Sequence, residues 1–262
     1  MIRNRLQSVG LALYRRLAAA GLLDRPWVRA AYERTYLVYK ALIEAGSVTL
    51  LRQWVRPNTS VIDVGANVGF FTVRFARWTS GEGKVFALEP EILNYQRLRR
   101  TLARSKVDTR VEAIQMAAAE VTGEVLLQIN PYNPADHRLG SSGIRVPATT
   151  IDDLLREQGW PVVSLIKIDV QGAEPRVLEG ARETIVKFRP AIFVEIHDES
   201  LRRSGATARE LLQSCLSLGY SLRVLSRGAV SGALTTGEVL ALEERYGYVD
   251  VLLLPSEISG SR

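Results

Sequence analysis

The sequence predicts an α/β protein built on a doubly wound sheet that is mostly parallel, and three observations indicate it. From about Ser60 onward, short apolar runs alternate with amphipathic segments, which is the pattern of strands that alternate with helices. The first of these runs passes into a glycine turn and then into a helical pattern. The 262 residues, of which 47% are hydrophobic, are enough for one domain with a full core.

The predicted elements alternate between strand and helix through most of this region. Parallel strands are expected at five places, residues 61–64, 85–88, 111–116, 162–168 and 191–196. Helices are expected over residues 69–78, through Tyr95, Leu98 and Leu102, and over residues 152–158 and 175–188.

The middle and the end of the chain depart from this alternation. An apolar run at residues 125–129 leads into a stretch rich in Pro, Asn and Gly over residues 130–143. We expect this stretch to be a loop, and its length favours a functional role. The pattern after the fifth strand predicts a helix through Leu211 and Leu216 and strands near residues 222–225 and 249–254. The last strand is expected to be antiparallel.

The N-terminal part is expected to be a basic helical segment over residues 1–55, followed by the main domain over residues 56–262. Up to Lys40 it carries eight Lys or Arg and two acidic residues, which accounts for the whole net charge of +6. Such a leader could contact an anionic membrane or an acidic glycan. The alternative is a solvated helical cap, because apolar residues recur there at helical spacing.

Several features favour a cytoplasmic protein that could still associate peripherally with a membrane. The single cysteine, Cys215, has apolar neighbours that place it on the buried face of a helix, and it cannot form an internal disulfide. The basic start resembles a secretion signal, but residues 14–16 interrupt the apolar run that follows. No run approaches the roughly 18 uncharged apolar residues that a membrane helix needs.

The strongest local signal is the strand, glycine turn and helix over residues 61–72. Such a turn lets a ligand approach the backbone and meet the N-terminus of the helix. A dinucleotide site needs a bare second glycine for the pyrophosphate, but here that position is Asn67, and Asp63 lies beside it. A carboxylate repels a pyrophosphate and suits a ligand with an ammonium and a sulfonium, such as S-adenosylmethionine. The alternative is a tight connection that binds no ligand.

Two further acidic positions end predicted strands. Glu89 follows the second strand, about 20 residues beyond the first glycine, where an acidic residue can accept both ribose hydroxyls. Asp169 follows the fourth strand, and ligands of open α/β sheets bind outside the carboxyl ends of the strands. The alternative for Glu89 is an exposed position near a helix start, where the helix dipole favours a negative charge. The alternative for Asp169 is a carboxylate that is only solvated at the strand end.

Five segments together resemble the FkbM family of methyltransferases. They are residues 61–69, 87–90, 150–154, 166–174 and 189–197. The match extends from about Ser60 to His197, and the run around Asp169 is its most specific part. The resemblance implies a class I methyltransferase, Rossmann-like fold with S-adenosylmethionine as the methyl donor. It also implies O-methylation of a sugar, a glycan or a natural product.

The resemblance also implies roles by position. The loop around the methionine part of the donor would be formed by Asp63, Gly65, Asn67 and Gly69. Glu89 would accept the ribose hydroxyls, and Ala118 would lie beside the adenine. The turn around Ala118 is less polar than is usual in the family, which weakens the adenine assignment.

An aliphatic hydroxyl is a poor nucleophile at neutral pH, so a base or a metal must draw off its proton. Asp169 is expected to face the reacting methyl group. The other catalytic candidates are Glu174 at the start of the next helix, Glu195 and His197 after the fifth strand, and His137 in the long loop. Dipole complementation for Glu174, and a hydrogen-bonded loop position for either histidine, are the structural alternatives.

Metal use and the class of acceptor are left open at this stage. Asp169, Glu195 and His197 could ligate a divalent ion, although nothing in their spacing requires one. The basic leader suggests a nucleic-acid methyltransferase as a rival, but the rest of the chain is neutral, and no aromatic-proline motif of the kind that grips a flipped base follows the fourth strand. A second rival is a nucleotide-binding or scaffold protein without turnover. A small molecule or a glycan is the expected acceptor, and the sequence does not predict an oligomeric state.

Overall fold

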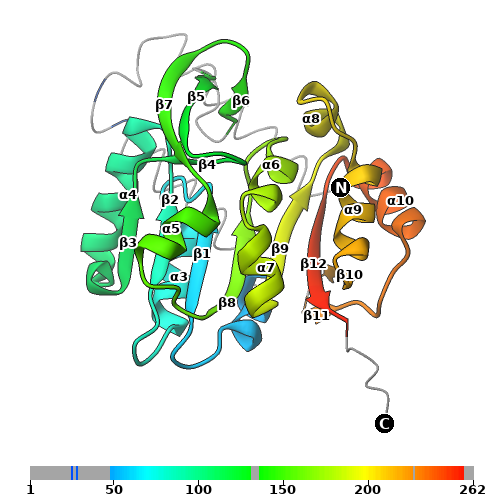
Figure 1. Ribbon diagram of the computed structural model, residues 1–262, viewed down its shortest axis with the longest axis horizontal. Helices are drawn as coiled ribbons and strands as arrows, with labels where there is room; N and C mark the ends of the chain where they lie inside the picture. The colour runs from blue at the N-terminus through cyan, green and yellow to red at the C-terminus, as the bar shows by residue number, and fades with distance from the viewer. Residues whose placement is uncertain (1–24, 26–27, 29–47, 131–135, 227, 257–262) are drawn as a thin grey trace.

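The computed structural model describes residues 25, 28, 48–130, 136–226 and 228–256, and a large sheet forms its centre (Figure 1). The strands of this sheet are β1 (Ser60–Val64), β2 (Val85–Leu88), β3 (Val111–Ile114), β8 (Val163–Ile168), β9 (Ala191–Ile196), β10 (Tyr220–Ser226), β11 (Ala229–Val230) and β12 (Val249–Pro255). Their order is β11-β10-β12-β9-β8-β1-β2-β3. The neighbours from β9 to β3 are parallel, as predicted. β12 is antiparallel to both β9 and β10, which confirms the expected antiparallel last strand.

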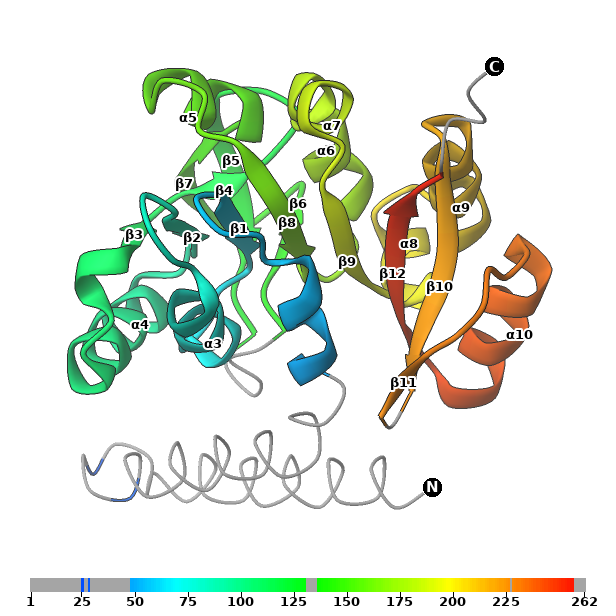
Figure 2. The ribbon, with the colours of Figure 1, turned by 90° about the horizontal axis from the view of Figure 1, so that it is seen from below.

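Helices cover both faces of this sheet. The described helices are α3 (Phe70–Trp78), α4 (Ile92–Ser105), α5 (Ile151–Glu157), α6 (Glu174–Glu179), α7 (Arg182–Phe188), α8 (Asp198–Arg203), α9 (Ala208–Ser217) and α10 (Thr236–Tyr246), with 3-10 turns η2 (Leu50–Trp54) and η3 (Asp108–Arg110). α3 and α4 lie on one face, and α5, α6 and α7 lie on the other (Figure 2). The arrangement is the doubly wound α/β fold that the alternating pattern predicts.

Each face of the sheet has its own apolar core. Successive strand residues point to opposite faces, so Val61 packs with α3 and α4 while Ile62 and Val64 pack with the helices of the other face. β8 is buried along its whole length, which explains its almost continuous apolar run. This burial makes the two charged residues in neighbouring strands, Asp63 and Lys167, unusual.

A second, smaller sheet was not predicted. It consists of β4 (Ala117–Ala118), β5 (Gly123–Gln128), β6 (Arg138–Gly140) and β7 (Ile144–Thr149), in the order β4-β7-β5-β6. The predicted loop over residues 130–143 is therefore wrong in its second half, because β6 pairs with β5 there. Many residues of these strands are exposed, so their apolar alternation is weak and the Pro and Gly residues dominate the pattern.

The helix expected over residues 175–188 is two helices, α6 and α7, that meet at Gly180. A side chain at Gly180 would overlap the carbonyl oxygen of Ala119, so the chain needs glycine at this close approach. Asp152 then caps the start of α7, accepting hydrogen bonds at 2.8 Å from the backbone N–H groups of Glu183 and Thr184. These tertiary contacts, which local periodicity cannot reveal, divide the helix.

The predicted leader over residues 1–55, with its expected membrane contact, lies almost entirely outside the described residues. Its described end, η2, buries Leu51 in the core beneath α3. Within the described part of the chain, no helix is both long and apolar enough to cross a membrane. The boundary at residue 55 stays a prediction.

Candidate active site

A cavity of about 860 Å³, counting its open mouth, lies between the carboxyl ends of β1, β2 and β8 and the small sheet. This is the place where open α/β sheets bind ligands. The predicted site residues in its lining are Gly65, Asn67, Glu89, Ala118, His137 and Asp169. The predicted site residues outside its lining are Asp63, Gly69, Glu174, Glu195 and His197. The structure thus separates the sequence candidates into two groups.

The glycine turn after β1 presents its backbone to the cavity. Gly65 has φ +72°, and a side chain there would overlap the carbonyl oxygen of Asp169. Asn67 also has a left-handed backbone, with φ 49°, which asparagine tolerates better than most residues. Its N–H donates to Glu89 Oε2 at 2.8 Å. Gly69 is the N-cap of α3 and packs against α4, so it shapes the turn without lining the cavity.

Asp63 lies beneath this turn rather than in the cavity. Its side chain is fully buried, and its Oδ2 accepts a hydrogen bond from the hydroxyl of Thr72 at 2.6 Å. The ammonium of Lys167 lies 3.2 Å from Oδ1, an atom that makes no hydrogen bond to a described residue. The same ammonium donates to the carbonyl oxygens of Val64 at 3.0 Å and Gly65 at 2.7 Å. Asp63 therefore positions the Lys167 ammonium, and this ammonium in turn binds the carbonyl oxygens of the glycine turn.

Lys167 lines the cavity and was missed by the sequence analysis. Its side chain is 2% exposed, although lysine is rarely buried without a partner. A lysine between Ile166 and Ile168 in a buried strand is the signal that could have found it. Pairing of the first and fourth strands places Asp63 directly beside it, which supplies the required countercharge. Asn94 and Gln171 also line the cavity and carried no such signal.

Glu89 lies at the end of β2 with its carboxylate facing the turn. Its Oε2 accepts from the N–H of Asn67, and its Oε1 accepts from the N–H of Glu91 at 3.0 Å. Burial raises the pKa of Glu89 to about 7, and these two backbone donors oppose the rise only in part. Each carboxylate oxygen keeps a second lone pair, so Glu89 can still accept hydrogen bonds from a bound ligand.

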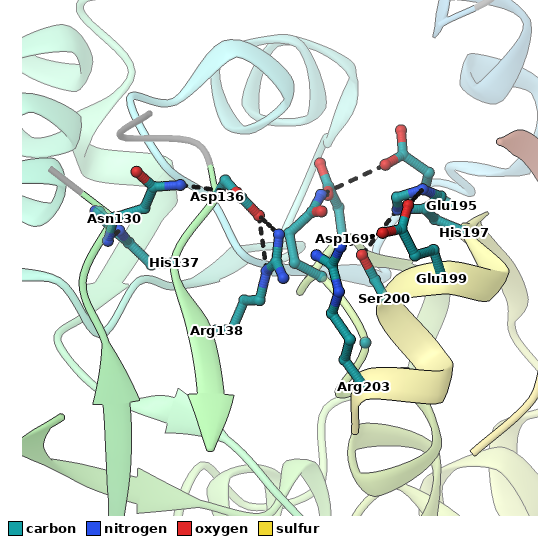
Figure 3. Close-up of polar contacts among 12 residues, drawn as sticks. Asn130, Asp136, His137, Arg138, Asp169, Glu195, His197, Glu199, Ser200 and Arg203 are labelled. Carbon is teal, nitrogen blue, oxygen red and sulfur yellow. Dashed lines mark hydrogen bonds and ion pairs between the residues drawn. The ribbon is translucent and has the colours of Figure 1, made fainter. Parts of the chain in front are cut away.

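Asp169 lies at the end of β8, and its side chain is 28% exposed. Its Oδ1 accepts a hydrogen bond from Gln171 Nε2 at 3.4 Å, and the same amide nitrogen donates to Glu195 Oε1 at 3.4 Å (Figure 3). Gln171 thus lies between Glu195 and the candidate base. Asp169 and Glu89 are the carboxylates among the described residues that line the cavity, and Asp169 is the one at the end of β8.

His197 and Glu174 have partners away from the cavity. His197 Nδ1 lies 2.8 Å from the hydroxyl of Ser200, within the same turn (Figure 3). Glu174 is 3% exposed, and its Oε1 accepts from the N–H of Gly172 at 3.1 Å. Burial raises the pKa of Glu174 to about 7. Both residues brace the segments that follow β8 and β9, and neither lines the cavity.

The metal-ligand set considered from the sequence is not assembled. Among the residues that the structure describes, no group of three or more His, Cys, Asp or Glu side chains is close enough to hold a metal ion. Asp169, Glu195 and His197 therefore do not form the envisaged site. Their strands are neighbours, but Glu195 is bound through Gln171 and His197 is turned to Ser200.

His137 lines the cavity, at the side of the small sheet. Its Nδ1 accepts a hydrogen bond from the backbone N–H of Asn130 at 3.1 Å. Burial lowers its pKa, which favours the neutral ring, and Nδ1 has no proton because it accepts. With Nδ1 accepting, the neutral ring is assigned the tautomer that carries its proton on Nε2 and can donate a hydrogen bond there. This tautomer does not suit the role of general base that was considered for His137.

The end of the cavity near His137 has apolar walls. Leu127 of β5, Leu139 of β6, and Ala117 and Ala118 of β4 line it. In Figure 3, His137 and Asn130 lie on one side of Asp169, while Glu195 and His197 lie on the other. The cavity thus has one end with a buried ion pair and another with apolar walls and a single imidazole.

Comparisons with known proteins show to which family the chain belongs. Residues 63–222, more than half of the chain, match the family model of the methyltransferase FkbM domain. The 31-O-demethyl-FK506 methyltransferase FkbM of Streptomyces tacrolimicus is 26% identical over 55% of this chain and 67% of its own. The 2-O-methyltransferase NoeI of Sinorhizobium fredii is 26% identical over 60% of this chain and 71% of its own.

A solved structure shows the same fold. The methyltransferase FkbM of Methylobacillus flagellatus KT superposes with a TM-score of 0.51 at 19% identity, over 76% of this chain. The match spans only 44% of that longer protein. With the family model matched over both the glycine turn and the Asp169 segment, the chain belongs to the FkbM family of S-adenosylmethionine-dependent methyltransferases.

Proposed function

We propose that this methyltransferase transfers the methyl group of S-adenosylmethionine to a hydroxyl of a sugar, a glycan or a natural product. The observation that carries the proposal is the position of Asp169. It is a partly exposed carboxylate in the cavity wall, next to the glycine turn. A hydroxyl acceptor needs such a proton acceptor, because an alcohol is a poor nucleophile at neutral pH.

The donor would lie across the strand ends. The backbone of Gly65, Ala66 and Asn67 would meet its methionine part, at the N-terminal side of α3. Glu89 would accept the ribose hydroxyls with its remaining lone pairs. The adenine would then lie between Ala118 and the leucine walls of the small sheet. This order puts the methyl group at the end where Asp169 lies.

The reaction is an in-line displacement at the methyl carbon. The acceptor oxygen forms a bond to this carbon while the bond between the carbon and the sulfur breaks. Asp169 takes the proton of the hydroxyl, and neutral S-adenosylhomocysteine leaves with the methyl ether. Correct placement of the oxygen supplies much of the acceleration, because no covalent intermediate is needed.

The acceptor class rests on two kinds of support. The names of the relatives describe transfer to oxygen, as in the 2-O-methyltransferase and the 31-O-demethyl-FK506 methyltransferase. Polar side chains also flank Asp169 on both sides, among them the Asp136–Arg138 ion pair at 2.6 Å and the His197–Ser200 pair (Figure 3). Such groups offer hydrogen bonds to an acceptor that carries several hydroxyls.

The test is transfer of a labelled methyl group from S-adenosylmethionine to a panel of glycans and hydroxylated natural products. Asp169→Asn should slow transfer to the best acceptor by about a hundredfold or more, because it removes the proton acceptor. Its affinity for S-adenosylhomocysteine should stay within about threefold, since Asn keeps the shape and one oxygen. Asp108→Asn is the matched control, because Asp108 is exposed in η3 and lies outside the cavity lining. Full activity of Asp169→Asn on that acceptor would contradict the proposal.

A further inference from the structure

Three charged groups lie side by side at the methyl-transfer end of the cavity. Asp63 of β1 is the direct strand partner of Lys167 of β8, so both side chains leave the sheet on the same face. Lys167 Nζ lies 3.2 Å from Asp63 Oδ1 and 3.7 Å from Asp169 Oδ2. Two carboxylates around one ammonium leave one negative charge in excess.

The ammonium of Lys167 is committed to the protein. It has three hydrogens, and the carbonyl oxygens of Val64 and Gly65 take two of them at 3.0 and 2.7 Å. Of the two carboxylates, the fully buried one of Asp63 is the nearer, and it forms the 3.2 Å ion pair with this ammonium. Lys167 and Asp63 therefore neutralise each other beneath the turn.

Asp169 is left as the unbalanced member of the group. Its side chain is 28% exposed, whereas the side chains of Lys167 and Asp63 are 2% and 0% exposed. Its side chain accepts a hydrogen bond from the uncharged amide of Gln171 at 3.4 Å, and the Lys167 ammonium lies farther from it, at 3.7 Å, than from Asp63. The excess negative charge thus faces the cavity at the strand end.

We propose that Lys167 is the positioning residue of the donor site, and that the three charged residues have two separate tasks. The buried Asp63–Lys167 pair shapes the glycine turn for any ligand with the adenosyl and methionine parts. Asp169 carries the excess charge that selects the cationic sulfonium of the donor over the neutral thioether of the product. The inference rests on the proposed function, since it assigns the same cavity to the donor.

The physical reason lies in the charge that the reaction removes. S-adenosylmethionine and S-adenosylhomocysteine differ by one methyl group and one positive charge at sulfur. A carboxylate in a partly buried wall attracts the sulfonium more strongly than it would in water, because the effective dielectric constant is lower. This attraction ends when the methyl group has left. The site therefore holds the donor and favours release of the product.

The test needs no acceptor, because calorimetry gives the Kd of both ligands. The readout is the ratio of the Kd for S-adenosylhomocysteine to the Kd for S-adenosylmethionine. Asp169→Asn should lower this ratio by about tenfold, equivalent to 1.4 kcal/mol, mainly because it weakens the binding of S-adenosylmethionine. The double variant Asp63→Asn/Lys167→Met removes both buried charges and replaces the two side chains with uncharged ones of similar shape. It should weaken both ligands together and leave the ratio within about twofold.

Thr72→Val provides the same test without a change of charge. It removes the hydroxyl that donates to Asp63 Oδ2 at 2.6 Å and nearly keeps the shape of the side chain. If the double variant does not fold, Thr72→Val should still weaken both ligands by a similar factor. An unchanged ratio in Asp169→Asn, or a ratio shifted tenfold by Thr72→Val or the double variant, would overturn the inference. Wild-type protein that binds neither ligand would instead refute the proposed function.

Discussion

The two ends of the cavity are built by different means. At the methyl-transfer end, Asp63, Lys167 and Asp169 come from neighbouring strands, and ion pairs and carbonyl contacts fix them to the buried sheet. The other end, where the proposed donor site places the ribose and the adenine, is called the nucleoside end. It is lined by Glu89 and by apolar residues of the small sheet, and one hydrogen bond orients His137. At the first end, buried ion pairs fix the positions of the side chains. At the second end, shape and single hydrogen bonds position them. Substitutions at the first end should therefore have larger effects.

The largest effect is expected at the glycine turn, with Gly65→Ala. A left-handed backbone costs an L-residue about 1–2 kcal/mol, and overlap with the carbonyl oxygen of Asp169 adds about 1–3 kcal/mol. We expect a loss of about 3 kcal/mol in the free energy of unfolding in urea, and no detectable binding of S-adenosylhomocysteine. Gly159→Ala is the matched control, because Gly159 has φ +75° but nothing within 4 Å of the added carbon.

Gly159→Ala should lose only the backbone part of this energy and bind the ligand normally. Equal destabilisation by the two variants would show that the turn is not held against Asp169. The methyl-transfer end would then be no more rigid than an exposed turn, and the contrast between the two ends would fail.

A smaller effect is expected from the pH dependence of donor binding, through Glu89. Its pKa is raised from 4.5 to about 7, and only the ionised form accepts both ribose hydroxyls. Binding should therefore release a proton, and the affinity for S-adenosylhomocysteine should rise by up to about tenfold between pH 6 and pH 8. Glu89→Gln should remove this rise, as calorimetry at several pH values would show. A rise that persists in Glu89→Gln would assign it to another group.

The same shift affects the stability of the free protein in the opposite sense. A folded-state pKa above the unfolded value means that the contribution of Glu89 to stability is fully present below pH 4.5. It is lost as the pH rises through about 7. Glu174 has the same direction of shift but lies outside the cavity, so Glu174→Gln should change stability with pH and leave the pH dependence of binding intact.

The smallest effect is expected from His137. If Nε2 donates a hydrogen bond to the bound donor, as the proposed site implies, its loss should cost about 1 kcal/mol, so His137→Ala should weaken S-adenosylhomocysteine binding roughly fivefold. His137→Gln, which keeps a donor, should recover part of the loss. At saturating donor, kcat of both variants should match that of the wild type. A hundredfold loss of kcat would restore His137 as a base and move catalysis to the nucleoside end.

The methyl-transfer end could largely be predicted from the sequence because its residues lie in contiguous motifs. The turn at Gly65 and the strand end at Asp169 each follow a buried strand, and the sheet brings all such ends to one edge. The roles within this end were less predictable. Asp63 follows the motif but points under the turn, because strand residues alternate between the two faces.

Most of the nucleoside end could not be predicted from local sequence patterns. Leu127 and Leu139 line this end and come from the partly exposed strands β5 and β6. These strands pair with each other, although the sequence between them predicts a loop. Ala118 of β4, shortly after the third strand, lines the cavity, and its contact with the adenine stays a prediction. His137 was recognised as a candidate, but its tautomer depends on the N–H of Asn130, a contact that no spacing in the sequence indicates.

A crystal structure of the protein with bound S-adenosylhomocysteine tests the central claim most directly, since it shows which end of the cavity receives which end of the ligand. The account predicts that the sulfur lies beside the carboxylate of Asp169, the ribose hydroxyls on Glu89, and the adenine between Ala118 and Leu139. A ligand bound in the reverse direction, with its sulfur next to His137, would contradict the account.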